Sequence, residues 1–185
     1  MRLFAAVLPP DDVIDELGAR VDRLPDGDGL RWTGRSGWHL TLAFYGDVPE
    51  ATAPDLAERL ARAAARTEAF EVGLRGGGHF GGRALWAGVA GETAALRRLA
   101  ERAEAAGRKA GIDGEHRRYR PHLTLARARD TYDFTPYLAA LDDFAGTPWT
   151  VGELALVRSN LPRSGVPGER PRYEKVGGWP LAGAR

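Results

Sequence analysis

Two histidines of this sequence begin the same five-residue segment. His39 starts His-Leu-Thr-Leu-Ala, and the segment recurs unchanged from His122, about half the chain further on. Imidazole titrates near neutral pH, so one copy can accept a proton while the other releases one. The threonine two positions after each histidine, Thr41 or Thr124, can donate a hydrogen bond to a phosphoryl oxygen without adding charge. The repeat therefore indicates acid–base chemistry on a phosphodiester.

Each copy of the repeat is predicted to be a β-strand. Side chains alternate between the two faces of a strand, so histidine and threonine share one face and the two leucines share the other. The leucines are the natural core face. Two such strands facing each other across a cleft would place the acid and the base on opposite sides of phosphorus, as in-line displacement requires. No metal is needed if imidazolium and hydroxyl donors take up the developing charge. The residues alone leave open which histidine is the acid.

Composition restricts the remaining classes. The chain has 185 residues, which suits one domain or two small lobes sharing a cleft. Its 26 basic and 25 acidic residues argue against a large basic surface for nucleic acid, although a local basic cleft is compatible. Cysteine is absent, which excludes disulfides, thiolate nucleophiles and cysteine zinc sites. No apolar run reaches transmembrane length, and the apolar N-terminus is predicted to be a first strand, so we expect a cytoplasmic protein.

The elements that must position the repeat alternate between strand and helix. Strands are predicted at 2–8, 39–45, 70–74, 84–89, 122–127, 149–158 and 173–179, and helices at 11–24, 52–66, from 93 to about 107–111, and after 135. The glycine-rich segment 76–82 is predicted to be a flexible loop. This order predicts an α+β fold with two pseudo-symmetric lobes of mainly antiparallel sheet, outer helices and an active-site cleft between the lobes. We expect a single domain over residues 1–185.

The two motifs resemble the HxTx motifs of the two-histidine phosphoesterase superfamily, and within it the RNA 2′,3′-cyclic phosphodiesterases of the 2′-5′ RNA ligase type. The resemblance spans nearly the whole chain, in family order. The matching segments are 2–7 with the following prolines, Trp32, 39–46, 85–89, 120–127, 159–161, Tyr173 and 179–181.

This resemblance implies hydrolysis of RNA 2′,3′-cyclic phosphate ends to 2′-phosphomonoesters, with 2′-5′ ligation as a reverse activity. It implies that His39 is the proton donor to the departing 3′ oxygen and His122 the proton acceptor from water. Thr41 and Thr124 would hold the phosphoryl oxygens. No cofactor and no metal are expected. The expected partners are RNA ends that bear a cyclic phosphate, with tRNA fragments as candidates, and the expected state is a monomer without a membrane or an obligate protein partner.

Two further residues on the motif strands are candidates for substrate binding. Tyr45 stands where the family usually has leucine, and strand alternation puts it on the face of His39 and Thr41, where it would stack on a base. Arg127 is the best candidate for contact with the RNA backbone because it lies on the second motif strand. Alternation puts Arg127 on the leucine face, which counts against direct phosphate contact.

Other polar residues stay open between two interpretations. Arg117, Arg118 and Arg120 form either a solvated surface or an RNA path, and the loop 160–172 either closes over substrate or only connects strands. His79 and His116 are expected to be solvated, because they lie in a glycine-rich and a basic segment. A metal site of all four histidines is disfavoured, because their spacing fits no familiar ligand pattern. The tryptophans are expected in the core.

Three alternative functions follow from the same residues. The chain could be a phosphodiesterase for a small cyclic nucleotide, which a panel of cyclic phosphates would reveal. It could be a non-catalytic RNA-binding module, which would bind RNA without turnover. A metal-dependent hydrolase would lose activity in chelator.

Overall fold

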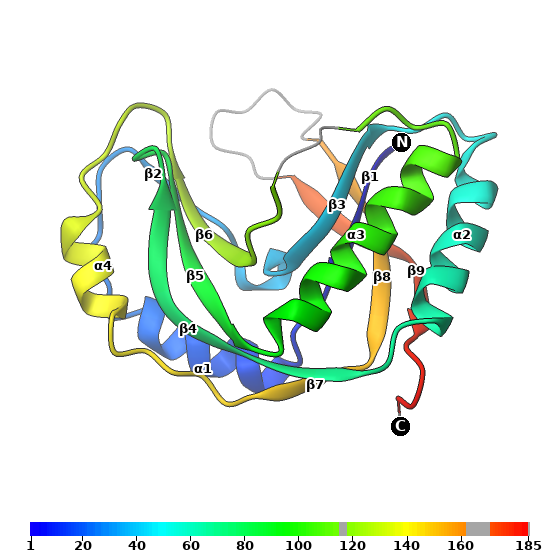
Figure 1. Ribbon diagram of the computed structural model, residues 1–185. Coiled ribbons are helices and arrows are strands. Elements are labelled where there is room, and N and C mark those ends of the chain that lie inside the picture. The colour runs from blue at the N-terminus through cyan, green and yellow to red at the C-terminus, as the bar shows by residue number, and fades with distance from the viewer. Residues whose placement is uncertain (115–117, 162–170, 185) are drawn as a thin grey trace.

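The computed structural model describes residues 1–114, 118–161 and 171–184, and these form two antiparallel sheets with helices on their outer sides (Figure 1). The elements in chain order are β1 (Arg2–Val7), α1 (Asp11–Val21), β2 (Leu30–Trp32), the 3-10 turn η1 (Arg35–Gly37), β3 (Leu40–Asp47), α2 (Ala53–Ala65), β4 (Phe70–Phe80), β5 (Ala84–Gly91), α3 (Thr93–Lys109), β6 (His122–Ala128), α4 (Thr135–Leu141), β7 (Trp149–Val151), β8 (Glu153–Asn160) and β9 (Arg172–Pro180). The predicted α+β class with antiparallel sheets is confirmed. No helix in the described ranges is long and apolar enough to span a membrane.

The two motif strands belong to different sheets and meet where the sheets adjoin. The first sheet has the order β3-β1-β8-β9 and the second the order β2-β6-β5-β4-β7. The first motif precedes and enters β3, which pairs with β1, and the second lies on β6, which pairs with β5. Cα atoms of β3 and β6 approach within 8 Å. The fold therefore brings together two segments that are far apart in sequence.

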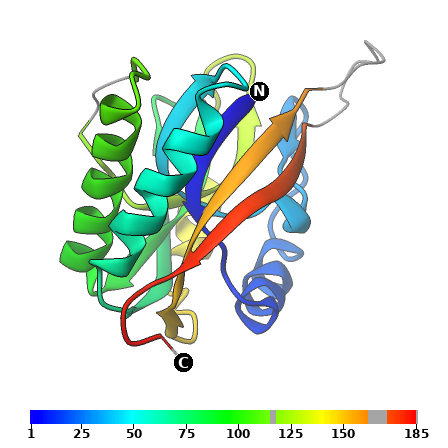
Figure 2. The same cartoon turned by 90° about the vertical axis from the view of Figure 1, so that its right-hand side faces the viewer.

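The helices between paired strands cross to the opposite half of the molecule. Helix α3 connects β5 to β6 of the second sheet but packs on β3 of the first, beside α2 (Figure 2). Helix α1 lies between β1 and β3 in sequence but is tied to the end of α4, because Arg20 donates hydrogen bonds to the Ala140 carbonyl at 3.0 Å and to Asp143 at 2.7 Å. This exchange joins the halves and limits how far the motif strands can move apart.

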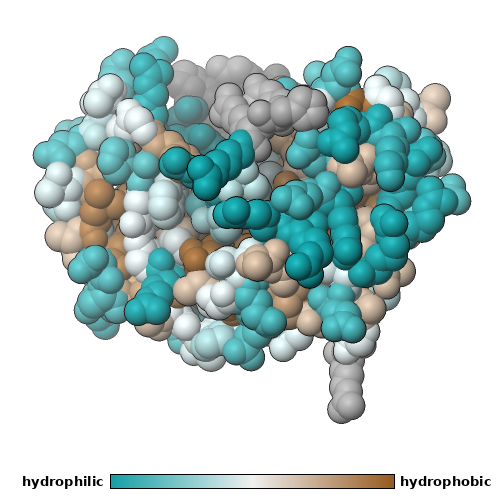
Figure 3. Space-filling view, viewed as in Figure 1, coloured by the Kyte–Doolittle hydropathy of each residue, from teal (hydrophilic) through white to brown (hydrophobic). Residues whose placement is uncertain are grey.

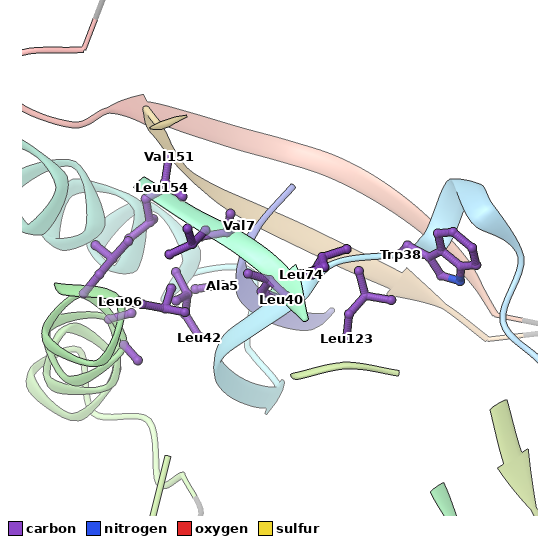
Figure 4. Close-up of a cluster of buried hydrophobic side chains, with 14 of the residues drawn as sticks. Ala5, Val7, Trp38, Leu40, Leu42, Leu74, Leu96, Leu123, Val151 and Leu154 are labelled. Atoms are coloured by element: carbon purple, nitrogen blue, oxygen red, sulfur yellow. The ribbon is translucent and has the colours of Figure 1, made fainter. Parts of the chain in front are cut away.

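The leucines of both motifs face a common core. Leu40, Leu123 and Leu125 have 0% of their surface exposed, and Leu42 has 5%. Figure 4 shows Leu40 and Leu42 in the same buried cluster as Leu123. Burial of such a side chain stabilises the fold by about 1.5–3 kcal/mol. The prediction that leucine marks the core face is confirmed, and histidine and threonine are left on the opposite face.

The prediction of a flexible loop over residues 76–82 is wrong for most of that segment. Strand β4 continues to Phe80, and Gly78 pairs with Trp86 of β5. A Cβ atom on Gly78 would lie 2.3 Å from the Trp86 ring, so the missing side chain is what lets this indole lie across β4. The glycines there thus serve close packing in a strand. Only the residues between β4 and β5 form the turn.

Candidate active site

Both histidines are oriented by the same backbone contact. Nδ1 of His39 lies 2.7 Å from the carbonyl oxygen of Gly37, and Nδ1 of His122 lies 2.6 Å from that of Arg120. A carbonyl can only accept a hydrogen bond, so Nδ1 carries the proton in each ring. In the neutral imidazole, Nε2 then has a free lone pair. The carbonyl two residues earlier therefore prepares Nε2 of each histidine for proton transfer.

The two Nε2 atoms differ in their present partners. Nε2 of His39 lies 2.9 Å from Oγ1 of Thr41, whose hydroxyl donates a hydrogen bond to the neutral ring. In the described parts of the chain, neither Nε2 of His122 nor the Thr124 hydroxyl has a side-chain hydrogen-bond partner. The half of the site around His122 is thus ready to meet a polar ligand, while binding on the His39 side must compete with the threonine contact.

Aromatic rings surround both imidazoles. The centroid of the His39 ring lies 4.7 Å from that of Phe4 and 5.4 Å from that of Tyr173. The second histidine has Phe80 at 4.8 Å and Trp86 at 6.0 Å. Trp86 is only half-buried, which corrects its assignment to the core. Tyr173 was not singled out as a site residue, because only the pairing of β9 with β8 brings it beside His39.

This environment favours the neutral form of both rings. Burial lowers the pKa of His39 and of His122, and the backbone carbonyl contacts oppose this only in part. The positive charge of Arg127 lowers the pKa of both histidines further, and His122 itself lowers the pKa of His39. A bound phosphate would have the opposite effect, because a nearby anion stabilises imidazolium.

Each motif strand has a β-bulge at its second leucine. Thr41 pairs with Ala6, but the next pair joins Ala43 to Ala5, so Leu42 has no partner of its own. In the second sheet, Thr124 pairs with Trp86 and Ala126 with Leu85, which leaves Leu125 unpaired in the same way. A bulge inserts one residue and changes which face the following side chains take. The pseudo-symmetry of the motifs therefore extends to an irregularity of the backbone.

The bulge moves Arg127 onto the face of His122 and Thr124. Beyond Leu125, Arg127 pairs with Ala84, which shares its face of β5 with Trp86, and Trp86 lies opposite Thr124. The prediction that Arg127 lies on the leucine face is therefore wrong, because it assumed unbroken alternation. The argument against a phosphate contact by Arg127 no longer holds.

The same effect removes Tyr45 from the site. Tyr45 is 5% exposed, and its hydroxyl donates a 2.7 Å hydrogen bond to the Ala103 carbonyl of α3. Phe44 takes the outward position instead and is 51% exposed. The prediction that Tyr45 stacks on a base is wrong, because the irregular register of β3 directs it into the core.

The remaining candidates lie around this centre or outside it. Arg118 and Arg120 are exposed, whereas Arg117, His116 and most of the loop 160–172 lie outside the described residues. His79 is exposed as predicted, and its Nδ1 accepts a hydrogen bond from the Gly82 amide at 3.0 Å. Within the described ranges, no three side chains of His, Cys, Asp or Glu come together as a group that could ligate a metal ion.

Comparison with known sequences identifies relatives of this chain. Residues 9–163 match the model of the 2′-5′ RNA ligase superfamily. The chain is 35% identical over 182 residues to a protein of Thermus thermophilus named RNA 2′,3′-cyclic phosphodiesterase, a match that covers 89% of this chain and 85% of that protein. A protein of the same name from Geobacillus stearothermophilus is 34% identical over 158 residues, covering 83% of this chain and 48% of the relative. The chain thus spans about half the length of the Geobacillus protein.

Solved structures give the same result at the level of the fold. A Thermus thermophilus protein has 30% sequence identity and a TM-score of 0.77, and the match covers 100% of both chains. Escherichia coli LigT complexed with 3′-AMP has 26% identity and a TM-score of 0.80, and the match covers 97% of each chain. The architecture of two sheets is therefore shared with proteins of known structure.

Proposed function

This chain belongs to the 2′-5′ RNA ligase superfamily, and from that premise we propose that it hydrolyses RNA 2′,3′-cyclic phosphate ends to 2′-phosphomonoesters by metal-independent acid–base catalysis. The observation that carries the proposal is the matched pair of imidazoles. Each has Nδ1 held by a backbone carbonyl, and each stands at the start of a motif strand, two residues before a threonine. A module that only binds RNA has no need of two equivalent titrating groups.

In the proposed reaction, His122 accepts a proton from a water molecule whose oxygen attacks phosphorus. The bond from phosphorus to the 3′ oxygen breaks, and His39 donates its Nε2 proton to that oxygen, which leaves a 2′-phosphomonoester. His39 must then be protonated when substrate is bound. Burial lowers its pKa in the free protein, but the phosphodiester anion stabilises the imidazolium and opposes that shift. The assignment of His39 as the acid follows the family resemblance.

The hydroxyls and Arg127 serve the charge that develops on phosphorus. Thr124 has no side-chain partner among the described residues and is available to a phosphoryl oxygen. Thr41 becomes available when His39 is protonated, because imidazolium Nε2 no longer accepts its hydrogen bond. Arg127 lies on the same face as Thr124 and adds a guanidinium, which is suited to phosphate. Donors fixed before the reaction stabilise the transition state without reorganisation.

Ligation of RNA ends through a 2′-5′ linkage belongs to the same proposal. A 5′-hydroxyl of a second RNA can take the place of water, with His122 again accepting the proton. Attack on the cyclic phosphate then forms a 2′-5′ linkage and releases the 3′ hydroxyl.

The expected cytoplasmic location and monomeric state are also part of the proposal. Cell fractionation tests the location, and light scattering tests the monomeric state.

The deciding experiment uses a short RNA that ends in a 2′,3′-cyclic phosphate, incubated with the pure protein in excess chelator. We expect conversion to a 2′-phosphate, with the rate lowered at least about 100-fold in His39→Ala and in His122→Ala, since positioned acid–base groups contribute about 10²–10⁴-fold. The exposed His79→Ala is the matched control and should retain full activity.

Other outcomes identify the alternatives. Binding of RNA without any conversion would favour a binding module. Conversion of 2′,3′-cyclic mononucleotides but not of RNA would favour a small-molecule phosphodiesterase. Loss of activity in chelator, restored by a divalent metal, would contradict the metal-independent mechanism.

A further inference from the structure

A groove of about 850 Å³ lies beside the two histidines, along the edge of the second sheet. One wall is formed by the segment from β2 to η1, and the other by the start of β9. The groove is continuous with the site at Gly37, whose carbonyl holds His39, and at Tyr173, whose ring lies 5.4 Å from that imidazole. A ligand that enters the site can therefore continue into the groove.

The described side chains that line the groove carry only positive charge. Arg31, Arg127 and Arg172 line it, and no carboxylate does so among the described residues. Arg31 lies directly opposite Arg127 in the pairing of β2 with β6. Like charges at directly opposed positions destabilise a sheet, so an anion between them would relieve a cost that the free protein bears.

The arginines of the groove differ from a neighbouring arginine that is already paired. Arg35 of η1 forms an ion pair with Asp22 and a hydrogen bond to the Gly18 carbonyl. In contrast, neither Arg31 nor Arg172 forms an ion pair with any residue in the described ranges, and both are exposed. Their guanidinium groups are free to bind an external anion.

We propose that this groove binds the sugar–phosphate backbone of the RNA that precedes the cyclic end, with Arg31 and Arg172 contacting its phosphate groups. The inference rests on the proposed function and deepens it, because it makes the protein selective for polynucleotide ends over mononucleotides. Arginine is suited to phosphate, and the arginines of a groove that adjoins the site can contact the phosphates that precede the reacting one. Tyr173 is 39% exposed at the junction and offers a ring on which a base can stack.

The test compares two substrates in the same protein. One is a 2′,3′-cyclic mononucleotide, and the other is an RNA hexamer that ends in a 2′,3′-cyclic phosphate. The variants are Arg31→Gln, Arg172→Gln and their double combination. The matched control is Arg98→Gln, which removes an exposed arginine from a second basic groove between α2 and α3, where hydrophilic residues gather (Figure 3). Thermal melting confirms that each variant is folded.

We expect each single variant to lose about tenfold and the double variant about 100-fold in kcat/KM for the hexamer, since each substitution removes one hydrogen bond from a charged, exposed side chain. Its kcat/KM for the mononucleotide should stay within about twofold of the unmodified protein. The plot of log kcat/KM for the hexamer against log salt should become flatter by about 1.4, because each neutralised phosphate of a single strand contributes about 0.7. Arg98→Gln should leave kcat/KM unchanged for both substrates.

Three results would overturn the inference. An equal loss for both substrates would mean that the arginines act on the catalytic centre. A loss in Arg98→Gln as large as that in the groove variants would mean that the RNA follows another surface or responds only to net charge. If the unmodified protein turned over neither substrate, the proposed function would fail. Fluorescence anisotropy of a labelled hexamer would then test binding to the groove separately. Equal affinity of the double variant and the unmodified protein would count against the groove.

Discussion

At the residue scale, the charge of Arg127 acts on both histidines. Arg127 lies on the His122 face of β6 because of the bulge at Leu125, and its positive charge lowers the pKa of His39 and of His122. The same guanidinium can pair with the substrate phosphate. In the free protein, Arg127 therefore destabilises the protonated form of both histidines. In the complex, the same charge stabilises the bound phosphate.

We expect Arg127→Gln to move the pH profile of kcat/KM toward higher pH. Burial, the largest cause, would still hold the pKa of each histidine below its ordinary value, but the repulsion from Arg127 would be gone. Both limbs of the bell-shaped profile report the histidines of the free protein, so both should shift in the same direction. The maximum of kcat/KM should also fall, by roughly tenfold or more, because a charge-assisted contact is lost. An unchanged profile with a reduced maximum would show that Arg127 acts on substrate alone.

Tyr45 offers a test of the corrected position on β3. Tyr45→Phe removes the hydroxyl that donates to the Ala103 carbonyl, so we expect the free energy of unfolding to fall by about 0.5–1.5 kcal/mol. The kinetics on RNA should not change, since the ring is buried against α3. Chemical denaturation and steady-state assays check the two parts. A large rise in KM with unaltered stability would return Tyr45 to the substrate site.

At the element scale, the close approach of β4 and β5 positions the Trp86 indole beside His122. Gly78→Ala would place a Cβ atom 2.3 Å from the Trp86 indole, which must then shift. We expect a loss of about 1–3 kcal/mol in stability from overpacking. We also expect a fall in kcat, because Trp86 lies 6.0 Å from the His122 ring and displacement near a reacting group is costly.

Gly114→Ala is the control for this substitution, because among the described residues a Cβ there would meet only the Phe44 carbonyl, at 3.6 Å. It should leave stability and kcat near their original values. If Gly78→Ala lowered the melting temperature but left kcat intact below it, the position of Trp86 would have no bearing on the reaction.

At the scale of the whole molecule, the two sheets share one buried cluster and exchange helices, so we expect them to unfold together. Leu40 and Leu123 occupy equivalent positions of the two motifs in different sheets, and both belong to that cluster. Leu40→Ala and Leu123→Ala should each destabilise the protein by about 2–5 kcal/mol. In both variants, far-UV circular dichroism and tryptophan fluorescence should follow one coincident transition. Separate transitions for the two probes would show that the halves are independent.

Local patterns in the sequence determined the general architecture and the residues on which the proposed chemistry rests. The repeated histidine and threonine, the leucines between them, and the alternation of strands and helices all depend on spacing along the chain, which burial translates directly into structure. The α+β fold and the core face of the motifs were predictable for this reason. The proposed reaction rests on the same side-chain types and spacing. The site residues His39 and His122 were named from the same signal.

Only the tertiary structure decided which further side chains reach the site. A leucine has the same appearance in a regular strand and in a bulge, so nothing local indicated that Arg127 would turn toward the histidines and Tyr45 away from them. Tyr173 and Arg31 enter through the pairings of β9 with β8 and β2 with β6, which join residues far apart in the chain. Register and long-range pairing are set by the packing of the complete fold, and a short segment of sequence does not contain that information.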